Sequence, residues 1–138
     1  MQIDKLKSFP GHLMRRAQQT ITAFFAEELA EDDLTSVQFI ALVAIADLEE
    51  LDATRLAQLI HFDRATIGGV IERLERKGLV ARRQSPLDKR IKVLAATDAG
   101  KATILRCFPR VQKAQERFLA PLNEDERRTF MGLLARIV

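Results

Sequence analysis

Residues 52–79 constrain the fold most, because they encode two short helices separated by a tight junction at residues 61–62. Asp52 and Asp63 each stand where a side-chain oxygen caps the first turn of a helix. Apolar residues of the second helix recur at the spacing i, i+3, i+4 and i+7, at Ile67, Val70, Ile71 and Leu74. Gly78 then stands where a residue in the left-handed conformation ends a helix. The pattern predicts a helix-turn-helix.

A short β-hairpin is expected directly after these helices. Two runs with β-branched residues, 79–84 and 91–96, are joined by a segment that contains the turn formers Pro86 and Asp88. Basic side chains are frequent along the hairpin, at Arg82, Arg83, Lys89, Arg90 and Lys92.

The remaining chain reads as helices. One helix follows Pro10 and ends before the acidic stretch 31–33, and another begins at Thr35 or Ser36. Because the second of these is apolar on every side, it is expected to be buried all round. Thr97 is placed to cap a long helix, and Asn123 with Glu126 forms a capping box for the last one. The expected fold is mainly α with a small β-hairpin (α+β), and residues 1–138 are expected to form a single domain.

Composition excludes several classes of protein. The 138 residues contain one Cys and two His, too few for an internal disulfide or a zinc cluster. The catalytic motifs of hydrolases, nucleotide-binding enzymes and metalloproteases are missing, so neither an enzyme nor a cofactor is expected. No apolar run of membrane-spanning length and no signal peptide is visible, which favours a cytoplasmic protein without a membrane partner. Cys107 is expected to be a buried structural residue rather than a redox sensor.

The small net charge of +3 conceals two opposite regions. Residues 26–54 contain nine acidic residues and no Lys or Arg, whereas residues 55–92 contain ten basic and four acidic residues, a net charge of +6. Such a concentrated basic block attracts phosphate backbones, although a basic helix face is more often merely solvated.

Two consecutive glycines interrupt the second helix of the motif on its non-apolar face. Gly68 and Gly69 together cost this helix about 1.5 to 2 kcal/mol relative to two alanines. Close approach of the backbone to DNA explains this cost, because a helix fits the major groove. Tight packing against a neighbouring helix is the alternative explanation.

The segment 52–100 resembles the winged helix-turn-helix of the MarR family of bacterial transcription regulators. The resemblance depends on Asp88-Lys89-Arg90 at the hairpin tip, followed by Leu94, Thr97 and Gly100, with Arg64-Ala65-Thr66 and residues 74–80 upstream. The order of helices also matches over nearly the entire chain. Residues 35–100 would then form the winged helix-turn-helix, and residues 9–30 and 98–138 the dimerisation helices.

The resemblance implies that residues 63–73 form a recognition helix in the major groove and that Arg90, held by Asp88, enters the minor groove. The DNA-binding residues expected on this basis are Thr54, Arg55, Asp63, Arg64, Ala65, Thr66, Gly68, Gly69, Arg73, Arg82, Arg83, Asp88, Lys89 and Arg90. Members of the family often carry polar side chains where this chain has Gly68 and Gly69. Asp88 as a plain turn former is the alternative to its role in holding Arg90.

The resemblance further implies a homodimer on a palindromic operator in double-stranded DNA, released by a small effector that is often aromatic or phenolic. The expected effector-binding residues are His12, Arg15, Arg16, Gln19, Phe39 and Val43. Solvated charges and an ordinary core position for Phe39 are the alternative for these residues. The function expected is therefore a repressor, and the alternatives are a winged-helix module that binds an acidic protein and a regulator without a small-molecule effector.

Overall fold

The computed structural model describes residues 2–138, which divide into two compact units. One unit contains the residues up to Glu28 together with Arg110–Val138, and the other contains Leu29–Pro109. None of the helices within residues 2–138 is both long and apolar enough to cross a bilayer. The expectation that the whole chain forms one domain stays a prediction.

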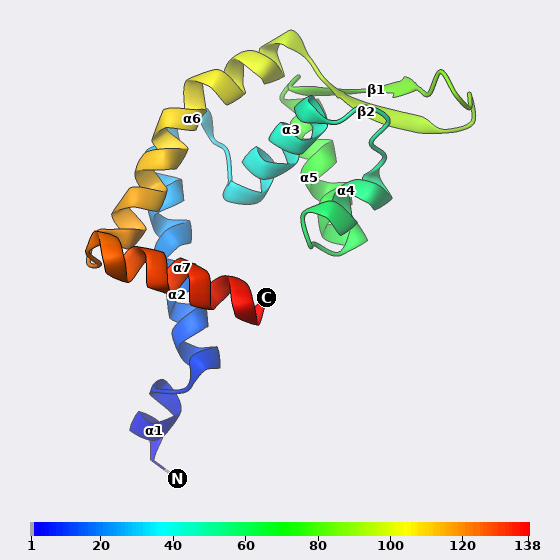
Figure 1. Ribbon diagram of the computed structural model, residues 1–138. Helices are drawn as coiled ribbons and strands as arrows, with labels where there is room; N and C mark the ends of the chain where they lie inside the picture. Colours follow the sequence, from blue (N-terminus) through cyan, green and yellow to red (C-terminus); the bar gives the residue numbers. More distant parts are fainter. Residues whose placement is uncertain (1) are drawn as a thin grey trace. The chain divides into compact units, whose positions relative to one another are not determined.

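The unit Leu29–Pro109 contains the elements expected for a helix-turn-helix with a hairpin (Figure 1). They are η1 (Ala30–Asp32), α3 (Ser36–Asp47), α4 (Ala53–Leu59), α5 (Arg64–Arg76), β1 (Val80–Gln84), β2 (Lys92–Ala96) and the first part of α6 (Asp98–Leu119). The two strands pair antiparallel, with Val80 opposite Ala96 and Gln84 opposite Lys92. The strand boundaries lie within one residue of those expected.

The predicted caps of this unit are confirmed by hydrogen bonds. Asp52 accepts a hydrogen bond from the backbone N–H of Arg55 at 2.8 Å. Thr35, the cap of α3, forms a reciprocal capping box with Gln38. Gly78 has a φ of +74°, so it provides the left-handed turn that ends α5 and turns the chain into β1.

The core of this unit is formed by α3, α4, α5 and β2. Six large apolar side chains from these elements are at most 1% exposed: Leu42, Leu56, Ile67, Ile71, Leu74 and Val93. The expectation that α3 is buried on every side is wrong for one face, because Ile40 is 47% exposed in the single chain. Cys107 is fully buried, as expected.

The start of α6 packs directly on the start of the hairpin. Thr97 accepts a hydrogen bond from the N–H of Gly100 at 3.0 Å, which confirms it as the cap of α6, and donates to the carbonyl oxygen of Gly78 at 2.6 Å. A Cβ atom on Gly100 would lie 2.1 Å from the carbonyl oxygen of Leu79. Only glycine therefore permits this close packing, which fixes the hairpin against α6.

The other unit consists of α1 (Ile3–Lys7), α2 (Pro10–Glu28), the second part of α6 and α7 (Glu124–Ile137). The capping box of Asn123 and Glu126 is present, as predicted. Arg117 donates to Glu27 at 2.5 Å and to Glu28 at 3.0 Å, and its guanidinium lies 4.3 Å from the ring centroid of Phe24. Its hydrogen bond to Glu27 raises the pKa of Arg117 above its ordinary value. Arg117 therefore braces α6 against α2.

Candidate nucleic-acid interface

The exposed N-terminus of α5 is built around Asp63. One carboxylate oxygen of Asp63 accepts from the backbone N–H of Thr66 at 2.9 Å, and the other accepts from the Thr66 hydroxyl at 2.6 Å. These hydrogen bonds, that from the hydroxyl first, lower the pKa of Asp63, so it stays ionised near neutral pH. Asp63, Arg64, Ala65 and Thr66 are all exposed, so the structure brings these four predicted residues together at one helix end.

Neither glycine of α5 packs against another element within residues 2–138. A Cβ atom on Gly69 would meet nothing within 4 Å. On Gly68 it would meet only the guanidinium Nη1 of Arg64, at 3.2 Å, which is the flexible end of an exposed side chain. Tight packing against a neighbouring helix of the chain therefore does not explain these glycines. The helix surface is thus open at Gly69, and at Gly68 it is covered only by the Arg64 side chain.

The tip of the hairpin holds an arginine in a carboxylate fork. Arg90 Nε donates to Asp88 Oδ1 at 3.2 Å, Arg90 Nη2 donates to Asp88 Oδ2 at 3.1 Å, and the backbone N–H of Arg90 donates to Oδ1 at 3.0 Å. The side-chain hydrogen bond from Arg90 is the main reason that the pKa of Asp88 is lowered. The Arg90 side chain nevertheless remains 90% exposed. The expectation that Asp88 holds Arg90 is thus confirmed.

The two arginines on β1 have carboxylate partners within the unit. Arg82 Nε donates to Glu75 of α5 at 2.9 Å, and Arg83 Nη1 lies 3.8 Å from Glu50. Glu50 also accepts a hydrogen bond from the hydroxyl of Ser85 at 2.5 Å. Sequence reasoning missed Glu50, Glu75 and Ser85: Glu75 of α5 holds Arg82, and Glu50, before α4, accepts from Ser85, directly after β1.

The other predicted DNA-binding residues are dispersed around these features. Thr54 and Arg55 are exposed on the first turn of α4, and Lys89 is exposed at the hairpin tip. Arg73, on the last turns of α5, lines a pocket against α3. Their contacts with DNA stay predictions.

The six predicted effector-binding residues belong to two elements. His12, Arg15, Arg16 and Gln19 are exposed on α2, Phe39 is buried on α3, and Val43 is half-buried on α3. The α2 residues belong to one compact unit and the α3 residues to the other. Their assignment to an effector site stays a prediction.

The helices α3 to α5 with the hairpin define the class of the protein: it is a winged helix-turn-helix. The sequence model of the MarR family matches residues 34–92 of the chain. The chain is 33% identical over 128 residues to the HTH-type transcriptional repressor NicR of Pseudomonas putida, covering 93% of this chain and 81% of NicR.

Two solved structures are similar over most of their length. BpsR of Bordetella bronchiseptica has a TM-score of 0.88 and 30% identity, over 95% of this chain and 94% of BpsR. A mutant MarR from E. coli, complexed with operator DNA, has a TM-score of 0.85 and 27% identity, over 93% and 92% of the two chains. The chain belongs to the MarR family, and it is a transcriptional regulator of that type.

Proposed function

We propose that this regulator is a dimeric, sequence-specific repressor that binds a palindromic operator. In this proposal α5 enters the major groove with residues 63–66 and the two glycines at the bases, and Arg90 enters the adjacent minor groove. A regulator of this kind works where its operator is, so we place it in the cytoplasm, and its activity is binding rather than catalysis.

The fork of Asp88 and Arg90 is the observation that carries the proposal. An exposed salt bridge contributes little to folding, in the range of about 0 to 1 kcal/mol, so stability does not explain this fork. Holding a guanidinium in one orientation at the tip of an exposed hairpin lowers the entropy lost when it binds a partner. A narrow minor groove has the negative potential that attracts such a cation.

The distribution of buried residues supports a dimer. Within the described part of the unit formed by the residues up to Glu28 and Arg110–Val138, the buried apolar residues are Phe25 and Ala114 alone. Several large apolar side chains of α2 and α7 are exposed in the single chain: Leu13, Met14, Met131, Leu133 and Ile137. Because a unit with so small a core gains little from burial by itself, a second copy is the partner we propose for these helices.

A small aromatic acid is the effector we propose, with His12, Arg15, Arg16, Gln19, Phe39 and Val43 as its binding residues. The structure reported for BpsR concerns regulation of its DNA binding by 6-hydroxynicotinic acid, and PcaV of Streptomyces coelicolor has been solved with its natural ligand. Arginine and aromatic side chains match the carboxylate and the ring of such a molecule.

Footprinting of the DNA upstream of the protein's own coding region tests the proposal, followed by titrations of the protected site at several salt concentrations. We expect a two-fold symmetric footprint, a steep loss of affinity with salt, and release by 6-hydroxynicotinic acid. Arg90→Ala should weaken binding by about 1 to 3 kcal/mol. Arg128→Ala is the matched control, because Arg128 is also exposed and paired with a nearby aspartate, Asp125, at 3.2 Å on α7.

Three results would count against the proposal. The absence of any protected site at this and neighbouring promoters would favour a module that binds an acidic protein. Equal affinities of the Arg90→Ala and Arg128→Ala variants would remove Arg90 from the groove. Binding that no aromatic acid changes would indicate a regulator without a small-molecule effector.

A further inference from the structure

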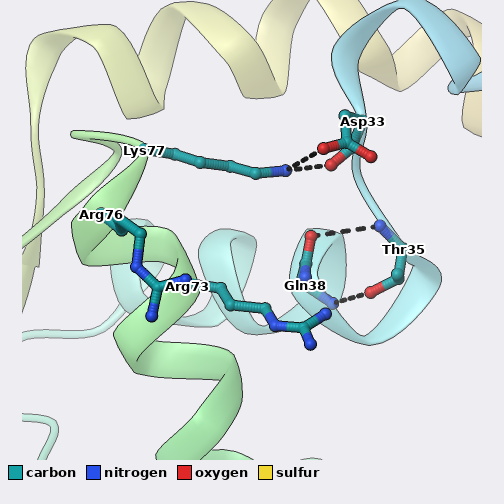
Figure 2. A pocket seen from close by; sticks show the side chains of 6 residues that line it. All are labelled: Asp33, Thr35, Gln38, Arg73, Arg76 and Lys77. Atoms are coloured by element: carbon teal, nitrogen blue, oxygen red, sulfur yellow. Dashed lines mark hydrogen bonds and ion pairs between the residues drawn. The ribbon is translucent and has the colours of Figure 1, made fainter.

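A pocket of about 280 Å³ lies between the N-terminus of α3 and the last turns of α5 (Figure 2). Its lining belongs entirely to the unit Leu29–Pro109. The lining residues are Asp33, Thr35, Gln38, Arg73, Arg76 and Lys77. This pocket shares no residue with the predicted effector site, and of the predicted DNA-binding residues it contains Arg73 alone.

Gln38 provides an unpartnered hydrogen-bond donor at the wall of this pocket. The capping box fixes the orientation of the side-chain amide, because Oε1 accepts a hydrogen bond from the backbone N–H of Thr35 at 3.3 Å. The amide nitrogen Nε2 is then the end that can donate to another group. The residue is only 3% exposed, yet Nε2 donates to no other residue within 2–138. Every fully buried side-chain nitrogen or oxygen within 2–138 has a hydrogen-bond partner. Because Nε2 has none, it must be accessible to solvent, that is, from the pocket. An acceptor inside the pocket would complete the hydrogen bonding of Gln38.

The pocket also gathers more positive than negative charge. Arg76 follows Arg73 by three residues and is followed directly by Lys77, so all three lie within about one helical turn at the end of α5. Lys77 donates to the backbone carbonyl oxygen of Asp33 and lies 3.7 Å from its carboxylate. The side chains of Arg73 and Arg76 form neither an ion pair nor a hydrogen bond with any described residue. Three cations and one carboxylate leave a local net charge of +2.

We propose that this pocket binds a small dicarboxylate. The two unpaired guanidinium groups each present a planar fork that matches a carboxylate, and Gln38 Nε2 adds a neutral donor. Two negative charges balance the local charge of +2, and the volume suits a molecule of a few carbon atoms. Binding ties the start of α3 to the end of α5, the helix that carries the predicted base contacts.

A DNA phosphate fits this pocket less well than a free dianion. Gln38 is only 3% exposed, so a small free carboxylate reaches its Nε2 more readily than a phosphate that is fixed in a duplex backbone. The Asp33 side chain is 97% exposed at the rim of the pocket. Its carboxylate would repel the phosphates that precede and follow a bound phosphate along a DNA strand, whereas a free dicarboxylate carries no such neighbours. In Figure 2 the Arg73 side chain extends from α5 towards α3, across the pocket.

The test is a calorimetric titration of the free protein with succinate, at constant ionic strength and without DNA, so its outcome is independent of the proposed repressor function. We expect saturable binding of one succinate per chain. Gln38→Glu should weaken it at least tenfold, because a glutamate keeps the oxygen that Thr35 needs but replaces the free donor with a negative charge. Arg76→Gln should weaken it by a similar factor, and it provides an independent test if the first variant does not fold.

Arg136→Gln, on α7, is the control for a simple loss of positive charge and should bind succinate like the unmodified protein. The proposal would be overturned if succinate showed no saturable binding, or if the folded Gln38→Glu and Arg76→Gln variants bound it as tightly as the unmodified protein. A Gln38→Glu variant that loses affinity for double-stranded DNA at low salt, in a protein that does not bind succinate, would instead assign the pocket to a DNA phosphate.

Discussion

Gly69→Ala separates the stability of α5 from its proposed contact with DNA. The substitution adds one methyl group where the structure has nothing within 4 Å, and Gly69 lies inside a regular helix. Alanine in such a position stabilises a helix by about 0.4 to 1 kcal/mol relative to glycine. For a chain of 138 residues we therefore expect the melting temperature to rise by about 1 to 4 °C. The glycine thus lowers the stability of the free protein.

The same methyl group should impair DNA binding. If the backbone of α5 approaches the bases at Gly69, an added methyl group must be accommodated at a cost of about 1 kcal/mol or more, which is at least about a fivefold loss of affinity. Thermal denaturation and titration of the footprinted site, on the same protein samples, measure both effects. Gly11→Ala, which also meets nothing within 4 Å but lies at the start of α2, should leave DNA affinity unchanged. A more stable Gly69→Ala variant with unchanged DNA affinity would refute the reasoning.

Two further substitutions test the packing and the cap of the winged unit. Gly100→Ala should destabilise the protein by about 1 to 3 kcal/mol in urea unfolding, because its Cβ would overlap the carbonyl oxygen of Leu79, and an unchanged unfolding midpoint would contradict this packing. Asp63 has a lower pKa in the folded protein than its ordinary value of 3.8, and this difference stabilises the fold. The stabilisation is fully present at a pH above 3.8 and is lost as the pH falls through the pKa of the folded protein. Asp63→Asn keeps an oxygen for the cap but does not titrate. Between about pH 5 and pH 2, a range that spans this transition, the melting temperature of the variant should therefore fall less than that of the unmodified protein. Identical pH dependences would contradict the assignment.

The helices and their ends could be predicted because their signals are local. The caps at Asp52 and Asp63 and the left-handed Gly78 each depend on residues within one helical turn. The fork of Asp88 and Arg90 spans only two residues, so the family motif was sufficient to anticipate it. Helix α1 (Ile3–Lys7) was missed, because it is five residues long and has no side-chain cap.

The supports of the hairpin and the pocket could not be predicted, because they depend on pairs far apart in the chain. Ser85 and Glu50 are separated by 35 positions, and Lys77 and Asp33 by 44. Neither pair has a spacing that a helical or strand period singles out. The exposed face of α3 was also invisible, because hydropathy identifies apolar residues but not the element that covers them.

The hairpin is attached to the residues before α4 at two points, and this divides its motions. The Ser85 hydroxyl donates to Glu50, and the backbone N–H of Leu94 donates to the carbonyl oxygen of Leu51 at 2.8 Å. The base of the hairpin should therefore open only together with the core, and the Leu94 amide should exchange its hydrogen slowly with solvent. Residues 86–91 lie beyond both attachments, and the hydrogen bonds of this loop run within residues 85–91. If the wing enters a groove as proposed, the conformational entropy lost at its tip should come mainly from this short loop, where Asp88 already restricts Arg90.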